Sequence, residues 1–531
     1  MPRIVLYDTT LRDGSQGEGI QFSVEDKLRL AQRLDALGVD VVEGGWPGAN
    51  SRDSLFFDRA RHLRFKGRLA AFGATRRPGI RPEDDAGLRG LLQAETAVIT
   101  VFGKSWLLHV RESLGIQARE NLDLVFDTID FLKKRVDTVI FDAEHFFDGY
   151  KDDPDFAIQV LRAAQSGGAD ALTLCDTNGG TLVFELEEIV QKTITLVPHI
   201  PLGIHCHNDS GLAVANTLAA VRAGVLQVQG TINGIGERCG NANLTTVIPN
   251  LMLKMGRETG ISRERLQSLT RLSRWMDELV NRSPRKDQPF VGRAAFAHKG
   301  GIHVSAVVKN SRTYEHVNPE LVGNQRRILI SDQAGRSNLI ARLAEFGIHG
   351  VEGDDPKLKD LLGEIKDLEN QGYQFEGADA SFELRARRAL MQMPVYFETE
   401  GFRVIDERRS RGNDDDKVMG AEATVKVTVG KTALHLVGEG AGPVDALHTA
   451  LLKALEWAYP GIRNMQLLDY KVRILQGEGT KAKVRVLIEW QDEVRQWSTV
   501  GVSDHIIAAS YDAMVEAVNY KLFKDQVDQV S

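Results

Sequence analysis

The sequence has few cysteines, and their spacing predicts no covalent framework. The 3 cysteines among 531 residues, Cys175, Cys206 and Cys239, form neither a disulfide pattern nor a CxxC pair. No apolar run approaches the roughly 20 residues that cross a bilayer. The first residues, MPRIVLYDTTLRDG, enter a predicted strand at once, which leaves no room for a signal or transit peptide. We therefore expect a cytoplasmic protein in a reducing compartment, without a membrane partner.

Excess charge is also small. Lys and Arg total 66 and Asp and Glu total 73, so the net charge is −7, and electrostatic binding to nucleic acid is not expected. Proline is scarce (15) and glycine abundant (50), a balance that favours tight strand-to-helix turns over long disordered linkers. At roughly 150 residues per domain, the length predicts three to four domains.

The first half of the chain repeats a unit of about 30 residues, in which a short apolar run precedes an amphipathic stretch. The predicted strands are Ile4–Leu6, Val39–Val42, Leu69–Phe72, Ala97–Phe102, Val136–Phe141, Ala169–Leu174, Pro201–Ile204 and Val225–Gln229. Eight such units predict an α/β fold, a (β/α)8 TIM barrel. A doubly wound sheet is the alternative, but it would carry a glycine-rich phosphate turn after its first strand, which is missing here.

Polar side chains cluster after these strands, where a TIM barrel carries its chemistry. They are Asp8, Arg12, Asp13, Glu43, Glu144, Asp176, Thr177, His205, His207, Asn233, Glu237 and Asn241. Solvation alone does not explain so many carboxylates, histidines and amides at one rim. We therefore expect a catalytic site there.

The segment GIHCHNDSG places His205 and His207 two residues apart at a predicted strand end. Side chains at i and i+2 of an extended chain point to the same side, so both imidazoles can face one ion. The first, seventh and eighth strands adjoin where a barrel closes, so Asp13 and Asn241 can complete the ligand set. Such donors suit Mn²⁺, Mg²⁺ or Zn²⁺, with positions left open for substrate. An exposed histidine pair without a metal is the alternative.

Four motifs resemble the family of isopropylmalate, homocitrate and citramalate synthases. They are LRDGSQ at Leu11–Gln16 followed by Lys27, IHCHNDSGLAVA at Ile204–Ala215, GERCGNANL at Gly236–Leu244 and HKGGIHVSAV at His298–Val307. Within the family, DGSQGEG, EGGWPGAN, FGATRR and FDAEHFFDGY resemble the citramalate-forming branch. The isopropylmalate branch usually has Glu and Pro where this chain has Ser15 and Gly17.

The resemblance implies a Claisen-type condensation of acetyl-CoA with a 2-oxo acid, followed by thioester hydrolysis. The citramalate-forming branch implies pyruvate as acceptor and isoleucine biosynthesis as the pathway. Condensation with 2-oxoisovalerate, for leucine biosynthesis, remains the alternative. A metallolyase on the same barrel and a non-catalytic amino-acid sensor are the hypotheses from other classes.

Three barrel residues are candidates for handling the oxo acid. Arg12 adjoins a metal ligand and would stabilise the alkoxide that forms, since a fixed cation counts most where charge develops; a rim salt bridge is its structural alternative. Thr177 would bind the substrate carboxylate, or else cap the following helix. Glu43 would orient Arg12 or a metal-bound water.

The acetyl methyl group must lose a proton, and Glu144 and His303 are the candidate general bases. The resemblance places His303 on a segment that folds over the barrel, but Ser305 stands where family members often carry an acid, so the choice stays open. The structural alternatives are a packed loop histidine and, for Glu144, a carboxylate paired with Arg12. The resemblance also assigns Asn310 and Tyr314 to coenzyme A.

We expect four segments. Residues 1–270 form the catalytic barrel, 271–406 a lid with mostly helical connecting subdomains, 407–419 a polar linker, and 420–531 a separable α+β domain of β-α-β-β-α order. The last segment resembles the regulatory domain of the family, which implies isoleucine as feedback effector and a homodimer.

Overall fold

The protein is described by a computed structural model over residues 2–329, 335–391, 393–410, 417–475 and 482–530. The chain divides into two compact units. The first comprises Met1–Phe296 and His316–Arg326, and the second Ala297–Glu315 and Arg327–Ser531. Among the described residues, no helix combines the length and the apolar character that a membrane crossing requires.

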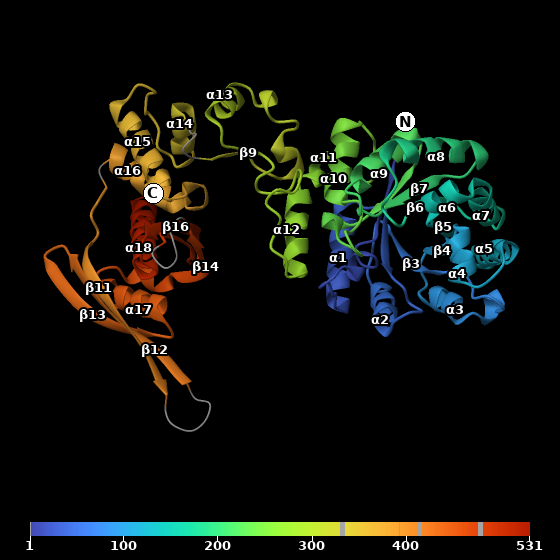
Figure 1. The fold of residues 1–531 in the computed structure, drawn as a ribbon, viewed down its shortest axis with the longest axis horizontal. Coiled ribbons are helices and arrows are strands. Elements are labelled where there is room, and N and C mark those ends of the chain that lie inside the picture. The colour runs from blue at the N-terminus through green and yellow to red at the C-terminus, as the bar shows by residue number, and fades with distance from the viewer. Residues whose placement is uncertain (1, 330–334, 392, 411–416, 476–481, 531) are drawn as a thin grey trace. The chain divides into compact units, whose positions relative to one another are not determined.

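The first unit is a closed barrel of parallel strands, β1 to β8 in sequence order (Figure 1). The strands are β1 (Val5–Asp8), β2 (Val41–Gly45), β3 (Arg68–Ala74), β4 (Val98–Lys104), β5 (Thr138–Glu144), β6 (Ala171–Asp176), β7 (Leu202–Cys206) and β8 (Gln227–Gly230). Pairing of β1 with β8 closes the barrel, with Val5 opposite Gln227. The predicted TIM barrel is confirmed.

The helices of this unit alternate with the strands and surround them. They are α1 (Val24–Leu37), α2 (Ser51–Ala60), α3 (Ala86–Gln93), α4 (Leu107–Glu112), α5 (Ala118–Lys133), α6 (Phe146–Asp152), α7 (Pro154–Ser166), α8 (Val183–Leu196), α9 (Ala213–Ala223), α10 (Leu244–Pro249), α11 (Arg263–Leu266) and α12 (Leu269–Leu279). Local sequence sets their ends. At α1, Ser23 and Asp26 form a capping box, and Gly38 ends the helix at φ 107°.

Each observed strand ends one to three residues later than predicted. The apolar runs stop early because the upper strand positions carry polar side chains. Glu43, Glu144 and His205 therefore lie within strands rather than after them. Below them, the strands contribute a small apolar cluster of buried residues: Tyr7, Val41, Ala70, Val98, Ile140 and Ala171. The polar site thus belongs to the rigid barrel wall.

The second unit is helical first and then α+β, as expected. Its helices are α13 (Gly301–Lys309), α14 (Arg336–Glu345), α15 (Pro356–Asn370), α16 (Asp379–Leu390), α17 (Pro443–Leu455) and α18 (Ile506–Val530). Strands β9 (Ala297–His298) and β10 (Arg327–Ile328) pair in parallel. Two antiparallel sheets follow, β11-β12-β13 (Glu398–Ser410, Lys417–Val429, Thr432–Gly440) and β14-β15-β16 (Gln466–Ile474, Val484–Gln491, Gln496–Ser503).

The predicted linker at 407–419 is wrong at both of its ends. Residues 407–410 continue β11 and 417–419 begin β12, and the two strands pair antiparallel with Ser410 opposite Lys417; residues 411–416 lie outside the described part. Polar composition favoured a loop, but backbone pairing in a ribbon does not require apolar side chains. Strand β11 was missed for this reason, whereas β16 was missed although Trp497 and Val500 in it are buried.

The predicted boundaries at 270 and 420 also differ from the compact units. The barrel core extends through Val280, Phe290 and Phe296 and includes Val322. In the second unit, Ala380 of α16 belongs to the same apolar core as α17 and α18. The apolar core of the C-terminal α+β part therefore includes residues before the predicted boundary at residue 420.

Candidate metal centre and active site

Three side chains at one rim of the barrel are close enough to hold one ion. Asp13 follows β1, and His205 and His207 lie at the end of β7; their ligand atoms all lie within 4.8 Å of one another. Asp13 Oδ2 is 3.6 Å from His205 Nε2 and 3.8 Å from His207 Nε2. The two Nε2 atoms are 3.4 Å apart. The structure thus brings together three of the four expected ligands, all of them buried.

Asn241 is the fourth. Its Nδ2 donates to Asp13 Oδ1 over 2.8 Å, and its backbone forms a β-bridge with His207. Its Oδ1 is buried and has no hydrogen-bond partner among the residues that the structure describes. An unsatisfied buried acceptor is costly, and a cation beside it would remove that cost. Carboxylate, imidazole and amide donors together fit a divalent ion such as Mn²⁺, Mg²⁺ or Zn²⁺.

The electrostatics of the cluster favour the metal-binding protonation states. Burial lowers the pKa of His205 to about 3, and burial likewise lowers the pKa of His207. Both imidazoles are therefore neutral, the form that ligates metals. Burial would raise the pKa of Asp13, but the charge of Arg12 is the largest effect that opposes this rise, and the pKa lies well below its usual range.

Arg12 is fixed by contacts on three sides. Its Nη1 donates to Asp13 Oδ2 over 2.9 Å, and its Nε donates to Glu43 Oε2 over 2.5 Å. Its guanidinium carbon lies 3.8 Å from the ring centroid of Phe72. Tyr7 donates to the other Glu43 oxygen over 2.8 Å. Burial raises the pKa of Glu43, and the charge of Arg12 opposes that rise. Glu43 thus contacts Arg12 directly, and its role in orienting Arg12 stays a prediction.

Aromatic rings form a wall beside Arg12. Trp46 packs edge-on against Phe72 and Phe102, with ring centroids 5.9 Å and 5.6 Å away, and Phe72 stacks on Phe102 at 5.4 Å. Lys27 and Asp53 form a buried ion pair, and Asp53 also accepts a hydrogen bond from the Trp46 backbone N–H over 2.8 Å. Asp53 thus fixes the backbone of the loop that carries Trp46.

Glu144 and Thr177 lie at neighbouring strand ends. Glu144 pairs with Lys104, because the register of β4 and β5 places the two residues opposite each other. The alternative that paired Glu144 with Arg12 is therefore wrong. Thr177 Oγ1 accepts from the His145 backbone N–H over 2.8 Å. Helix α8 begins at Val183 with Leu182 as its cap, so the helix-capping alternative for Thr177 is wrong as well.

Other polar residues at the rim tie the loops together. Thr10 binds both Asp8 oxygens, Thr181 Oγ1 donates to Asp176, and Asn233 Nδ2 donates to Asp277. Asp8 and Asp176 bond to residues of their own strand ends and loops, and Asn233 bonds to Asp277 of helix α12. These contacts give these residues a structural role.

Arg238 joins three loops of the same rim. It adopts a left-handed backbone conformation at φ 54°. Its Nε and Nη2 donate to the two oxygens of Asp209 over 2.8 Å and 3.0 Å, and Nη2 also donates to the Thr177 carbonyl over 2.6 Å. The loops after β6, β7 and β8 are therefore bound to one guanidinium.

Sequence reasoning missed a polar network inside the barrel. Gln229 Oε1 accepts from His205 Nδ1 over 2.9 Å, and Gln229 Nε2 donates to Asp142 and Thr173, each over 3.1 Å. Burial raises the pKa of Asp142 to about 7. The available signal was a polar residue at an inward position within an apolar strand. The pattern of polar residues after the strands does not include Gln229 and Asp142, because both lie inside strands.

The remaining candidates belong to the second unit. His303 of α13 stacks on Tyr314, with ring centroids 4.3 Å apart. Asn310 accepts from the Arg312 backbone N–H over 3.0 Å and caps a short helix. The catalytic role of His303 and the coenzyme A contacts of Asn310 and Tyr314 stay predictions.

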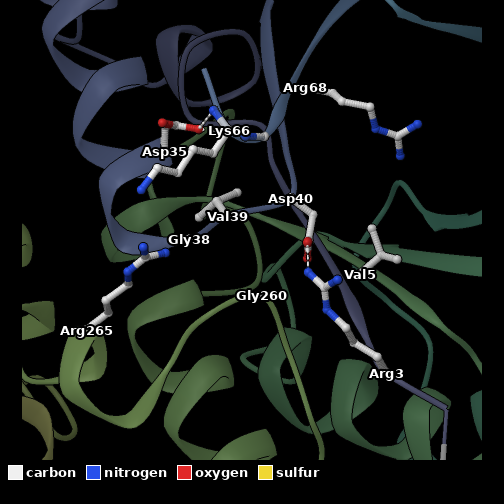
Figure 2. Close-up of a pocket in the computed structure, with 11 residues that line it drawn as sticks. Arg3, Val5, Asp35, Gly38, Val39, Asp40, Lys66, Arg68, Gly260 and Arg265 are labelled. Atoms are coloured by element: carbon white, nitrogen blue, oxygen red, sulfur yellow. Dashed lines mark hydrogen bonds and ion pairs between the residues drawn. The ribbon is translucent and has the colours of Figure 1, made fainter. Parts of the chain in front are cut away.

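A separate pocket of about 410 Å³ lies at the opposite end of the barrel, where the strands begin (Figure 2). Arg3 pairs with Asp40 there, and Asp35 accepts from the backbone N–H groups of Lys66 and Gly67 over 2.7 Å each. These carboxylates hold loops in place. In TIM barrels this end serves stability, and catalysis occurs at the other.

Comparisons with known families agree with this arrangement. The HMGL-like family matches residues 3–273, the homocitrate synthase post-HMGL domain-like family matches residues 290–373, and the LeuA allosteric (dimerisation) domain matches residues 376–522. The chain belongs to the HMGL-like family, with a barrel that carries a candidate divalent-metal site.

Full-length relatives narrow the similarity. The chain is 54% identical over 531 residues to the (R)-citramalate synthase of Geobacter sulfurreducens and 52% identical over 530 residues to that of Aquifex aeolicus, with 99% of each chain covered in both cases. A probable 2-isopropylmalate synthase of Methanopyrus kandleri is 33% identical over 519 residues, covering 97% of this chain and 98% of that protein. The expected resemblance to the citramalate-forming branch is confirmed.

Proposed function

We propose that this protein condenses acetyl-CoA with pyruvate and hydrolyses the thioester, giving (R)-citramalate and free CoA. The observation that carries the proposal is the cluster of Asp13, His205, His207 and Asn241 in a chain 54% identical to an (R)-citramalate synthase over its whole length. A bond forms between the acetyl methyl carbon and the keto carbon of pyruvate. Water then cleaves the C–S bond and releases the CoA thiol.

The four ligands would hold a divalent ion that polarises the keto group of the acceptor. Arg12 is placed beside Asp13 by two charge-assisted bonds, so its guanidinium can face the oxygen that gains negative charge as the new bond forms. A donor fixed in advance stabilises that charge without reorganisation. Glu43 and Phe72 hold Arg12 in this position.

Thr177 is proposed to bind the acceptor carboxylate. Its Oγ1 accepts a hydrogen bond from the His145 backbone N–H. The hydroxyl hydrogen of Thr177 points away from that bond and can be donated to the carboxylate. Glu144, on the same rim, is one candidate base for the acetyl proton, and it forms an ion pair with Lys104. His303 of the second unit is the other candidate. Asn310 and Tyr314 are proposed to hold coenzyme A.

The aromatic wall favours a small acceptor. Phe72 lies directly against the Arg12 guanidinium, and Trp46 and Phe102 pack behind it. Rigid rings leave little freedom to admit a branched side chain next to the reacting carbon. One methylene is worth about 1–3 kcal/mol in an apolar pocket, so the preference for pyruvate over 2-oxoisovalerate is a measurable ratio.

The test is thiol release from acetyl-CoA with pyruvate, 2-oxoisovalerate or 2-oxoglutarate in the presence of Mn²⁺. We expect kcat/KM for pyruvate to exceed the other two by about tenfold or more. A preference for 2-oxoisovalerate would establish the isopropylmalate alternative instead. Absence of CoA release with all three acids would point to the non-catalytic sensor.

Regulation is proposed to reside in residues 376–522, which match the LeuA allosteric (dimerisation) domain. A product of the downstream pathway, isoleucine, is the proposed effector, acting on a homodimer in the cytoplasm. In the full-length chain, isoleucine should inhibit and leucine should not, and sedimentation should give a dimer. Inhibition by leucine alone would refute the pathway assignment.

A further inference from the structure

Gln229 occupies a central position in the barrel interior. It lies on β8, is fully buried, and contacts side chains of β5, β6 and β7. One of these, His205, is a proposed metal ligand. Its second ring nitrogen, Nδ1, bonds to Gln229 Oε1 over 2.9 Å.

The network permits one orientation of the Gln229 amide. Both hydrogens of Nε2 have acceptors, Asp142 Oδ1 and Thr173 Oγ1, each at 3.1 Å. An ionised carboxylate can only accept. A flipped amide would turn its oxygen toward the carboxylate of Asp142 and lose the bond between them.

The orientation of the amide decides the tautomer of His205. Because Gln229 presents an oxygen, Nδ1 must carry the ring hydrogen of the neutral imidazole. The lone pair then resides on Nε2, which faces Asp13 and His207. A ligand held by a hydrogen bond to its other nitrogen is a frequent feature of metal sites. His207 lacks such support within the described part of the chain, where its Nδ1 has no hydrogen-bond partner.

We propose that Gln229 is a positioning residue that, held by Asp142 and Thr173, fixes His205 in the tautomer that presents Nε2 to a divalent ion. The inference rests on the proposed metal-dependent function and extends it to three residues deep in the barrel. It makes His205 the pre-organised ligand of the pair and leaves His207 free to adjust.

The test measures Mn²⁺ binding at pH 8, from the electron paramagnetic resonance signal of free Mn²⁺. Gln229→Met keeps the length of the side chain and removes the acceptor, and it should raise the Kd for Mn²⁺ about 10–100-fold. Gln229→Glu still offers an oxygen to Nδ1 but replaces the donor that faces Asp142 with an acceptor, so its affinity for Mn²⁺ should lie between those of Gln229→Met and the wild type. Thr173→Val is nearly isosteric and should weaken binding in the same direction, which keeps the test valid if Gln229→Met fails to fold.

Gln227→Met is the matched control. Gln227 lies two residues earlier on the same strand and is also buried, and its Nε2 has no hydrogen-bond partner in the described ranges. Its replacement should leave the Kd for Mn²⁺ unchanged. Equal Mn²⁺ affinity in the wild type and in Gln229→Met and Thr173→Val would overturn this inference alone. A wild-type protein that binds no Mn²⁺ would overturn the proposed function.

Discussion

Gly236 is the residue whose substitution tests the metal centre without removing a ligand. It follows β8, and its φ of 155° is one that side chains rarely adopt. A Cβ built there would lie 2.1 Å from Asn241 Nδ2 and 3.0 Å from Asp13 Oδ1. In Gly236→Ala the amide of Asn241 must therefore retreat by about 1 Å, a displacement that can cost about 100-fold in rate when it affects a catalytic group.

Two measurements on the purified variant follow from this. We expect kcat/KM for pyruvate to fall about 100-fold and the Kd for Mn²⁺ to rise, because the bond between Asn241 and Asp13 breaks. The backbone strain should cost roughly 1–3 kcal/mol of folding free energy. Circular dichroism and the thermal midpoint separate that loss from the loss at the metal centre.

Gly180→Ala is the control. Gly180 lies in the loop after β6, and a Cβ there meets nothing within 4 Å. Activity and Mn²⁺ affinity should match those of the wild type. If Gly236→Ala also retains both, the observed positions of Asn241 and Asp13 are not needed for binding, and the reasoning fails.

Three further predictions concern single side chains. Arg12→Lys should lower kcat about 100-fold and change KM for pyruvate little, because lysine cannot make the bonds to Asp13 and Glu43 together; a change in KM alone would make Arg12 a binding residue. His207→Ala should abolish turnover and weaken Mn²⁺ binding, and near-normal activity in metal-replete buffer would contradict the ligand assignment. Burial lowers the pKa of His448, and the charge of Asp445 opposes that shift to a smaller extent. Below about pH 6.5, His448 therefore binds a proton in the unfolded chain but not in the native state. The free energy of unfolding then falls by up to about 1.4 kcal/mol for each pH unit of acidification. In calorimetric scans at pH 7.5 and 5.5, His448→Leu should lose less stability on acidification than the wild type, and an equal loss would refute this origin.

The barrel was predictable because its strands carry runs of apolar residues that need no context to be recognised. Asp13, His205 and Asn241 were predictable for a different reason: parallel strands of a closed barrel deliver their carboxyl ends to one rim. Distances of 3.6 Å and 2.8 Å among these side chains depend on exact register, and the sequence pattern cannot supply that.

Gln229 and Asp142 could not be found in the same way. For a polar residue inside an apolar run, the sequence does not tell whether the side chain points into or out of the barrel until the strand register is known. In addition, Gln229 and Asp142 lie on β8 and β5, which are not adjacent in the barrel. The error at residues 407–419 is of another kind. There the polar side chains predicted a loop, whereas the segment forms strands because the backbones of β11 and β12 pair with each other.

The contacts of Arg238 bear on how this barrel can be re-engineered. Since one guanidinium binds Asp209 and the Thr177 carbonyl, the loops after β6, β7 and β8 form a single mechanical unit. If only one of these loops were replaced by that of a homologue with another substrate range, Arg238 or one of the groups that it binds would lose its hydrogen-bond partner. Grafts that aim to alter acceptor choice should exchange all three loops together, with their arginine and aspartate as a set.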